Sequence, residues 1–167
     1  MFQFLQVFTL LLIAVTLAFS LAHAGELPGK LRLHKDDYLA VQTIYYPGFT
    51  IGGVSEPISV LALIAFVASI GFENPAFGWA LAALVSMALV NAIFWLVTQP
   101  VNKIWLQNQN LSGASQAFFS AGTKRKASTP ADWTTLRDKW EYSHVARAIF
   151  AMLGLIFFGV AITSPSV

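Results

Sequence analysis

The chain has 167 residues, of which 56% are hydrophobic and 11% are charged. Ordinary soluble domains carry roughly a quarter charged residues, so this composition excludes that class and predicts a single membrane domain. The net charge of +2 and the scattered basic residues argue against nucleic-acid binding, and the lack of cysteine excludes disulfides, thiolate nucleophiles and thiolate-held iron–sulfur clusters.

The first apolar run covers about residues 2–24 and carries no charge, which predicts a membrane-spanning helix. Ala22-His23-Ala24 resembles a small-x-small signal-peptidase site, so a cleaved signal peptide is the competing interpretation. Because no lysine or arginine precedes the apolar run, an uncleaved span is favoured.

Three further spans are expected at about residues 50–72, 77–98 and 144–162. The second is extended to include residues before Gly52, because the run after Pro57 is short for a span; this puts Glu56 inside the helix. The third is expected to end before Gln99-Pro100. The fourth helix is expected to begin near residues 128–132, where capping residues and a proline lie, and to run unbroken into the membrane. The predicted fold is an all-α, integral membrane four-helix bundle, with a partly cytoplasmic extension of the fourth helix.

The ten lysines and arginines lie in only two stretches, from Lys30 to Lys35 and from Lys103 to Arg147. With four spans, the loops at about residues 25–49 and 99–143 lie on the same side of the membrane. The positive-inside rule then predicts that both loops are cytoplasmic and that both termini lie outside, in a plasma (inner) membrane protein. The only basic cluster, Lys124-Arg125-Lys126, is expected to contact lipid headgroups.

Two polar stripes have the alternating three- and four-residue spacing of one helical face. The stripe near the fourth span consists of Trp133, Arg137, Trp140, His144 and Arg147. The stripe near the end of the third consists of Asn91, Trp95, Thr98 and, beyond an expected bend at Pro100, Asn102.

Glu56 and the pair of His23 and Glu26 belong at a similar depth, so these side chains predict a polar pocket near the cytoplasmic interface. A structural alternative stands beside the pocket. Tryptophans form belts at membrane interfaces, and Glu56 with Arg147 can be an ion pair that holds helices together. An enclosed cavity bordered by Glu56, His144 and Arg147 would favour the pocket, whereas side chains closed on one another would favour the structural role.

The histidines limit the cofactors that the chain can hold. Only His23 and His144 are placed to flank a haem b, and that is the alternative to a protein without a cofactor. No close histidine pair suggests zinc, and the chain has neither a glycine-rich phosphate loop nor a nucleophile elbow.

Several segments resemble the anthrone-oxygenase-like family of small four-span membrane proteins, most of whose bacterial members have no assigned activity. They are Glu26-Leu27-Pro28-Gly29-Lys30, Tyr45-Tyr46-Pro47, Gly53 with Glu56-Pro57, Pro100-Val101-Asn102, and the stretch from Trp133 to Arg147. Their order and spacing cover nearly the whole chain.

The resemblance implies oxidation of an anthrone-like flat aromatic by molecular oxygen without metal or flavin. His144 would be the base that ionises a phenol, and Arg147 would stabilise the anion, with Glu56 as the third catalytic residue. Trp95 and Trp140 would stack on the substrate, and Asn102 and His23 complete the expected substrate-binding set.

Two other functions remain open. The chain can be a non-catalytic accessory subunit of a larger membrane complex or a homo-oligomer, because its 14 phenylalanines and five tryptophans suit a surface covered by lipid or by partners. A transporter is less favoured, since one four-helix unit without repeats has little room for a pathway.

Overall fold

The computed structural model describes residues 2–45, 48–105 and 132–165. Every regular element within these ranges is helical. In chain order they are α1 (Phe2–Lys30), α2 (Lys35–Gln42), the 3-10 turn η1 (Thr43–Tyr45), α3 (Gly48–Gly53), α4 (Ser55–Ile70), α5 (Phe77–Ile93), the π-helical turn η2 (Phe94–Thr98), α6 (Gln99–Trp105) and α8 (Trp133–Thr163).

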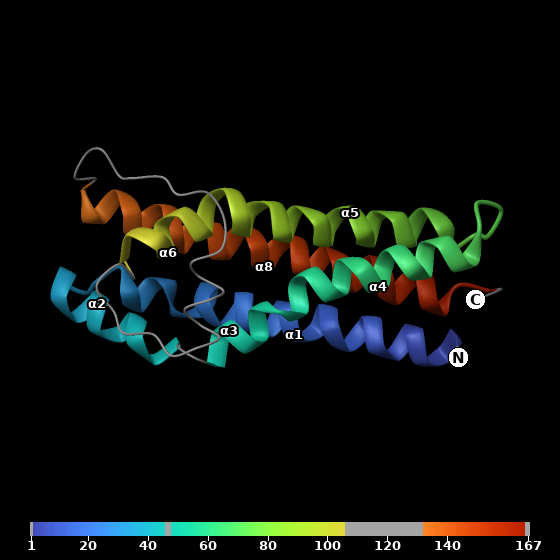
Figure 1. Ribbon diagram of the computed structural model, residues 1–167, viewed down its shortest axis with the longest axis horizontal. Coiled ribbons are helices and arrows are strands. Elements are labelled where there is room, and N and C mark those ends of the chain that lie inside the picture. Colours follow the sequence, from blue (N-terminus) through green and yellow to red (C-terminus); the bar gives the residue numbers. More distant parts are fainter. Residues whose placement is uncertain (1, 46–47, 106–131, 166–167) are drawn as a thin grey trace.

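Four long helical segments lie side by side along the long axis of the molecule, which confirms the predicted all-α four-helix bundle (Figure 1). Each segment is long and apolar enough to cross a membrane: Phe2–Lys30, Gly48–Ile70, Phe77–Trp105 and Trp133–Thr163. The two chain termini lie at one end of the bundle, and α2 and α6 lie at the other (Figure 1).

The helices extend beyond the predicted spans. α1 continues through Pro28 to Lys30, and the third segment passes Pro100 and ends at Trp105 rather than before Gln99. The second begins at Gly48, as its extended form predicts. The fourth runs unbroken from Trp133 to Thr163 after the N-cap Asp132, again as expected. The predicted helix start at residues 128–131 and the basic cluster at 124–126 lie outside the described residues.

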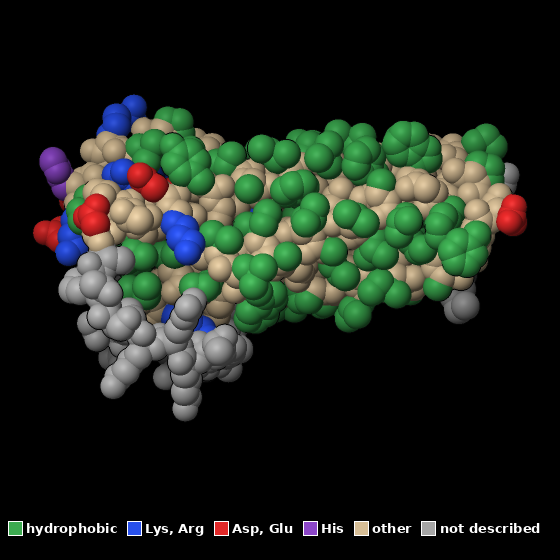
Figure 2. Space-filling view, turned by 90° about the horizontal axis from the view of Figure 1, so that it is seen from above, with side chains coloured by type: hydrophobic (Ala, Val, Ile, Leu, Met, Phe, Trp, Pro, Cys, Tyr) green, Lys and Arg blue, Asp and Glu red, His purple; other side chains and the backbone are tan. Residues whose placement is uncertain are grey.

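The surface separates into an apolar band and a charged end. Hydrophobic side chains cover most of the length of the bundle in Figure 2, whereas lysines, arginines and histidine gather at one end. A broad apolar band on helices of this length suits a lipid bilayer. The charged end is the one that carries α2 and α6 (Figure 1).

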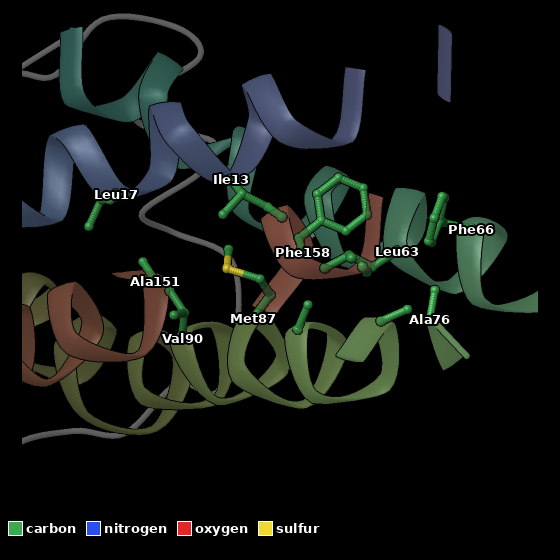
Figure 3. Close-up of a cluster of buried hydrophobic side chains, with 12 residues drawn as sticks. Ile13, Leu17, Leu63, Phe66, Ala76, Met87, Val90, Ala151 and Phe158 are labelled. Atoms are coloured by element: carbon green, nitrogen blue, oxygen red, sulfur yellow. The ribbon is translucent and has the colours of Figure 1, made fainter. Parts of the chain in front are cut away.

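The half of the bundle nearer the termini has a dry core. Ile13, Leu63, Phe66, Met87 and Phe158 meet there from all four long segments and are fully buried (Figure 3). α5 and α8 approach closely at Gly154, where a Cβ atom would lie 3.0 Å from Sδ of Met87 and 3.6 Å from Cβ of Ser86. The buried polar side chains of this half, such as Thr9, Ser59 and Ser86, carry only hydroxyl groups, and among the described residues the buried charged groups lie in the other half.

Candidate functional site

An ion pair joins α4 to α8 in the polar half of the bundle. Glu56 lies in the first turn of α4, and its Oε1 accepts a hydrogen bond from Nη2 of Arg147 on α8. Both side chains are buried. The predicted pairing of these residues is therefore present, and a buried pair is stable only while both partners remain.

Arg147 also fixes the hydrogen-bonding state of His144. Its Nη1 lies 3.2 Å from Nδ1 of His144, one turn earlier on the same helix. A guanidinium has only N–H donors, so Nδ1 accepts and the hydrogen of the neutral ring resides on Nε2. His144 thus presents a donor, not a free basic nitrogen, to its remaining surroundings. The base role expected for His144 would require Arg147 to release it.

His23 completes the contact between α1 and α8. Its ring centroid lies 4.1 Å from that of His144 and 4.9 Å from that of Trp140. Trp140 in turn donates from Nε1 to Oδ1 of Asn102 over 2.7 Å. The structure therefore brings together six of the seven predicted site residues: His23, Glu56, Asn102, Trp140, His144 and Arg147.

These residues border a cavity of about 50 Å³. Its remaining walls are largely aromatic and come from α1, η1, α3 and η2. The full lining consists of Phe19, Ser20, His23, Tyr45, Phe49, Gly53, Glu56, Phe94, Thr98, Asn102, Trp140, His144 and Arg147. Glu56 and Arg147 are closed on each other, and a partly open space remains beside them, so the choice between the pocket and the structural role stays open.

Three buried polar atoms on these walls have no hydrogen-bond partner among the described residues: Ser20 Oγ, His144 Nε2 and Arg147 Nε. Unpaired buried donors are costly, so they indicate water or a ligand in the adjoining space. The two nitrogens are donors in the state described above, and they call for an acceptor oxygen. About three waters fit such a volume.

Trp95 is the predicted site residue that lies outside the cluster, and it is 41% exposed. The stripe containing it assumed a regular α-helix, whereas residues 94–98 form the π turn η2. The buried positions here recur every four residues, at Ser86, Val90, Phe94, Thr98 and Asn102. In an α-helix each four-residue step overshoots a full turn by about 40°.

The wider π turn absorbs this excess and keeps one face toward the bundle. As a result Phe94 takes the inward position, with its ring centroid 5.3 Å from Cζ of Arg147. Pro100 explains why the turn occurs here, because its ring would clash with the carbonyl of Leu96 in a regular α-helix.

A haem does not fit between the two predicted axial histidines. Axial ligation places the macrocycle between two rings that approach the iron from opposite faces. The His23 and His144 rings are in direct contact, and Nδ1 of each already lies 3.2 Å from a cationic nitrogen. Among the described residues, no three His, Cys, Asp or Glu side chains converge as a metal site.

A second polar cluster, centred on Lys30, adjoins the first and was not predicted. The ammonium group lies 2.9 Å from Glu26 Oε2, 3.6 Å from Glu141 Oε1 and 3.2 Å from His23 Nδ1. Lys30 is buried at the end of α1, and Glu141 is fully buried on α8. Three polar partners thus surround the three N–H donors of one ammonium group.

Two tyrosines close this cluster from the segment between the first two spans. Tyr38 Oη donates to Glu141 over 2.8 Å, and Tyr45 Oη donates to Glu26. Burial first, and then the neighbouring carboxylates, raise the pKa of both phenols well above the usual range. Both tyrosines therefore act as fixed neutral donors at physiological pH.

One sequence signal could have revealed Lys30. Buried polar residues recur along α1 at intervals of seven, at Thr9, Thr16, His23 and Lys30, with Ser20 beside them. A seven-residue spacing keeps residues near one helical face. The charge pattern by itself predicts only topology for Lys30, since lysines near the ends of spans usually extend to the interface.

No family model, curated protein or solved structure matches this chain.

Proposed function

We propose that this protein is a small membrane enzyme of the cofactor-independent oxygenase type, acting on a small aromatic molecule with an ionisable oxygen. One observation carries the proposal: on the walls of one cavity, Ser20 Oγ, His144 Nε2 and Arg147 Nε are buried and find no hydrogen-bond partner within the part of the chain that the structure describes. Two of them are fixed donors that match an anionic oxygen. The aromatic walls formed by Tyr45, Phe94 and Trp140 suit a flat ring.

The geometry supports a changed division of roles. Arg147 and His144 act as the donors that stabilise the phenolate or enolate oxygen. Glu56 is the carboxylate on the cavity wall and takes the proton of the substrate. His23, Trp140 and Asn102 position the ring. Trp95 has no part in the site, and Phe94 takes its place.

The proposed chemistry follows from the ionised substrate. An electron-rich carbanion transfers electrons to molecular oxygen, a C–O bond forms, and loss of water from the hydroperoxide leaves a ketone. Oxygen is thus reduced by the substrate itself. The resemblance to anthrone-oxygenase-like proteins supports this choice, and the polar contacts of Arg147 and His144 supply the anion stabilisation that it requires.

The size of the cavity limits how a substrate binds. Pockets for drug-sized ligands measure about 300–1,000 Å³, and this cavity measures about 50 Å³. The oxygen-bearing edge of a ring enters the present space, and the rest of a larger substrate displaces Phe19 or Phe49. Phe19 packs edge-on against Phe49, with centroids 4.8 Å apart, and both line the cavity.

The buried charged groups do not continue to the other end of the bundle, which supports a binding site over a transport pathway. Beyond Glu56, the described residues of the other half form the apolar core around Ile13, Met87 and Phe158, whose buried polar side chains are hydroxyls without a buried charged group. We place the charged end in the cytoplasm and both termini outside, in the plasma membrane, because the basic side chains of the described residues gather at that end (Figure 2).

Binding and oxygen consumption test the function. Purified protein in detergent is mixed with anthrone or with a one-ring phenol, while tryptophan fluorescence and dissolved oxygen are followed. We expect quenching with both ligands and oxygen consumption with anthrone. Arg147→Gln should lose both signals. Arg137→Gln is the matched control, because Arg137 lies on the same helix but pairs with Asp138 away from the cavity.

Folded wild-type protein that neither binds these ligands nor consumes oxygen would contradict the proposal. If such protein also purifies with a stoichiometric membrane partner, the result would favour the alternative that the chain is an accessory subunit.

A further inference from the structure

A second hollow lies just outside the buried cavity. It is an open groove of about 500 Å³ at the charged end, between the end of α1 and the segment formed by α2 and η1. Its lining includes Glu26, Lys30, Arg32 and Tyr45. Tyr45 lines both hollows, so the wall between them is thin.

One polar contact crosses this wall. His23 lines the cavity and Lys30 lines the groove, and Lys30 Nζ lies 3.2 Å from His23 Nδ1. Glu26, 2.9 Å from Lys30, has a side chain that is 43% exposed. An unbroken series of polar contacts therefore runs from solvent through Glu26 and Lys30 to the imidazole of His23.

We propose that Lys30 and His23 form a proton path between the groove and the buried cavity, with Glu26 at its outer end. The path deepens the proposed function, which supplies the use for the proton: the peroxide formed from the substrate must be protonated before water is lost. Lys30 is then a proton donor acting through His23, and not only a counter-ion.

The hydrogen-bonding pattern fixes the direction of each transfer. An ammonium group is only a donor, so Nδ1 of His23 is the acceptor and the ring hydrogen resides on Nε2. Lys30 gives one proton to Nδ1 as Nε2 releases its own to an anion in the cavity. Neutral Lys30 then takes a proton from water in the groove by way of Glu26. After the product leaves, Lys30 releases a proton toward the groove and takes back the hydrogen of Nδ1, while Glu56 returns the proton of the substrate to Nε2 through water in the cavity. This restores the tautomer of His23, and no net proton is gained over the cycle.

The surroundings of Lys30 also permit a purely structural role. Glu26 and Glu141 both need a counter-charge, and the ammonium group lies 4.7 Å from the Tyr45 ring centroid and 5.2 Å from that of Trp140. Arginine can preserve the charge and the ion pairs, but it does not release a proton. Lys30→Arg therefore separates proton transfer from charge balance.

The test measures how fast the ring hydrogen of His23 exchanges with water, by NMR of protein carrying ¹⁵N-histidine in detergent. We expect Lys30→Arg to slow this exchange by about tenfold or more, because the arginine blocks the path without opening the wall. Arg32→Lys is the matched control, since Arg32 lines the same groove and is not within bonding distance of His23. It should exchange like wild type.

Wild-type exchange in folded Lys30→Arg would overturn the proposal. If that variant does not fold, Glu26→Gln decides, because glutamine still accepts from Tyr45 but cannot carry a proton. Slower exchange of His23 then supports the path, and unchanged exchange refutes it. No substrate is present, so this result is independent of whether the proposed oxidation occurs.

Discussion

The guanidinium of Arg147 bridges two groups that the sequence places far apart, donating from Nη2 to Glu56 and from Nη1 to Nδ1 of His144. Its Nε, on the cavity side, has no hydrogen-bond partner in residues 2–45, 48–105 and 132–165. One side chain thus neutralises a buried carboxylate, orients an imidazole and presents a donor to a ligand. Both the stability of the bundle and the proposed chemistry therefore depend on Arg147.

The Glu56–Arg147 pair predicts a marked difference between single and double substitutions. Glu56→Gln leaves the buried guanidinium without its counter-charge and should lower the free energy of unfolding by about 3–5 kcal/mol. Adding Arg147→Met removes the stranded charge and should restore much of the loss. Chemical unfolding in detergent measures both effects.

Glu73→Gln is the control for this cycle, because Glu73 lies in the exposed turn between α4 and α5 and should leave stability unchanged. A Glu56→Gln variant as stable as wild type would show that the pair is not closed in the folded protein.

The π turn predicts that substitutions at two adjacent aromatic residues lower the stability by very different amounts. Phe94 is buried against Arg147, so Phe94→Ala should lower the free energy of unfolding by about 3 kcal/mol or more. Trp95→Ala should cost less than about 1 kcal/mol, because the ring faces outward. The reverse order in thermal unfolding would mean that the helix is regular here and that Trp95 faces the cavity.

Hydropathy and charge were sufficient to predict the bundle. Apolar runs of the required length have few alternatives to spanning helices, so the four segments of the structure agree with those expected. The stripe on the fourth helix likewise predicted Trp140, His144 and Arg147, because α8 is regular over its length. A three- and four-residue spacing identifies the inward face of a helix as long as the helix is regularly α-helical.

The errors have two physical causes. Trp95 was misplaced because it lies inside the π turn, which changes its angular position relative to Thr98 and Asn102, and no α-helical spacing anticipates that turn. Lys30, Tyr38 and Glu141 were missed because their burial depends on contacts of α1 and α2 with α8, which is distant from both in the chain. A short segment such as α2 has no pattern that predicts where it packs.

Gly52 predicts a steric limit beside the site. A Cβ atom there would overlap the ring of Phe19, which lines the cavity. Gly52→Ala should therefore lower the free energy of unfolding by about 1–3 kcal/mol and alter ligand-induced fluorescence quenching. Gly159→Ala in α8 meets no atom within 4 Å and should be neutral or slightly stabilising. Equal stability of the two variants would contradict the close packing of Phe19 on α3.

The two buried tyrosines predict a loss of stability at alkaline pH. Folding raises the pKa of Tyr38 and Tyr45, whereas the pKa of tyrosine in the unfolded chain is about 10. The unfolded state thus releases protons first, so the free energy of unfolding should be level below about pH 9 and fall as the pH rises through 10.

Replacing both residues by phenylalanine should flatten this alkaline decline, although the overall stability is lower without the bonds to Glu141 and Glu26. Unfolding at a series of pH values, with ultraviolet absorbance to follow tyrosinate, measures the effect. A decline equally steep in the double variant would assign it to other groups.

The topology is tested most directly with introduced cysteines, because the natural chain has none. Lys35→Cys lies at the charged end, at the start of α2, and Phe72→Cys lies in the turn between α4 and α5, where Phe72 is 84% exposed. If the basic stretches face the cytoplasm, a membrane-impermeant maleimide should label Phe72→Cys in intact cells. Lys35→Cys should be labelled only after the membrane is opened. Labelling of Lys35→Cys in intact cells would show that the protein has the opposite orientation, with the groove and the proton path on the outer surface.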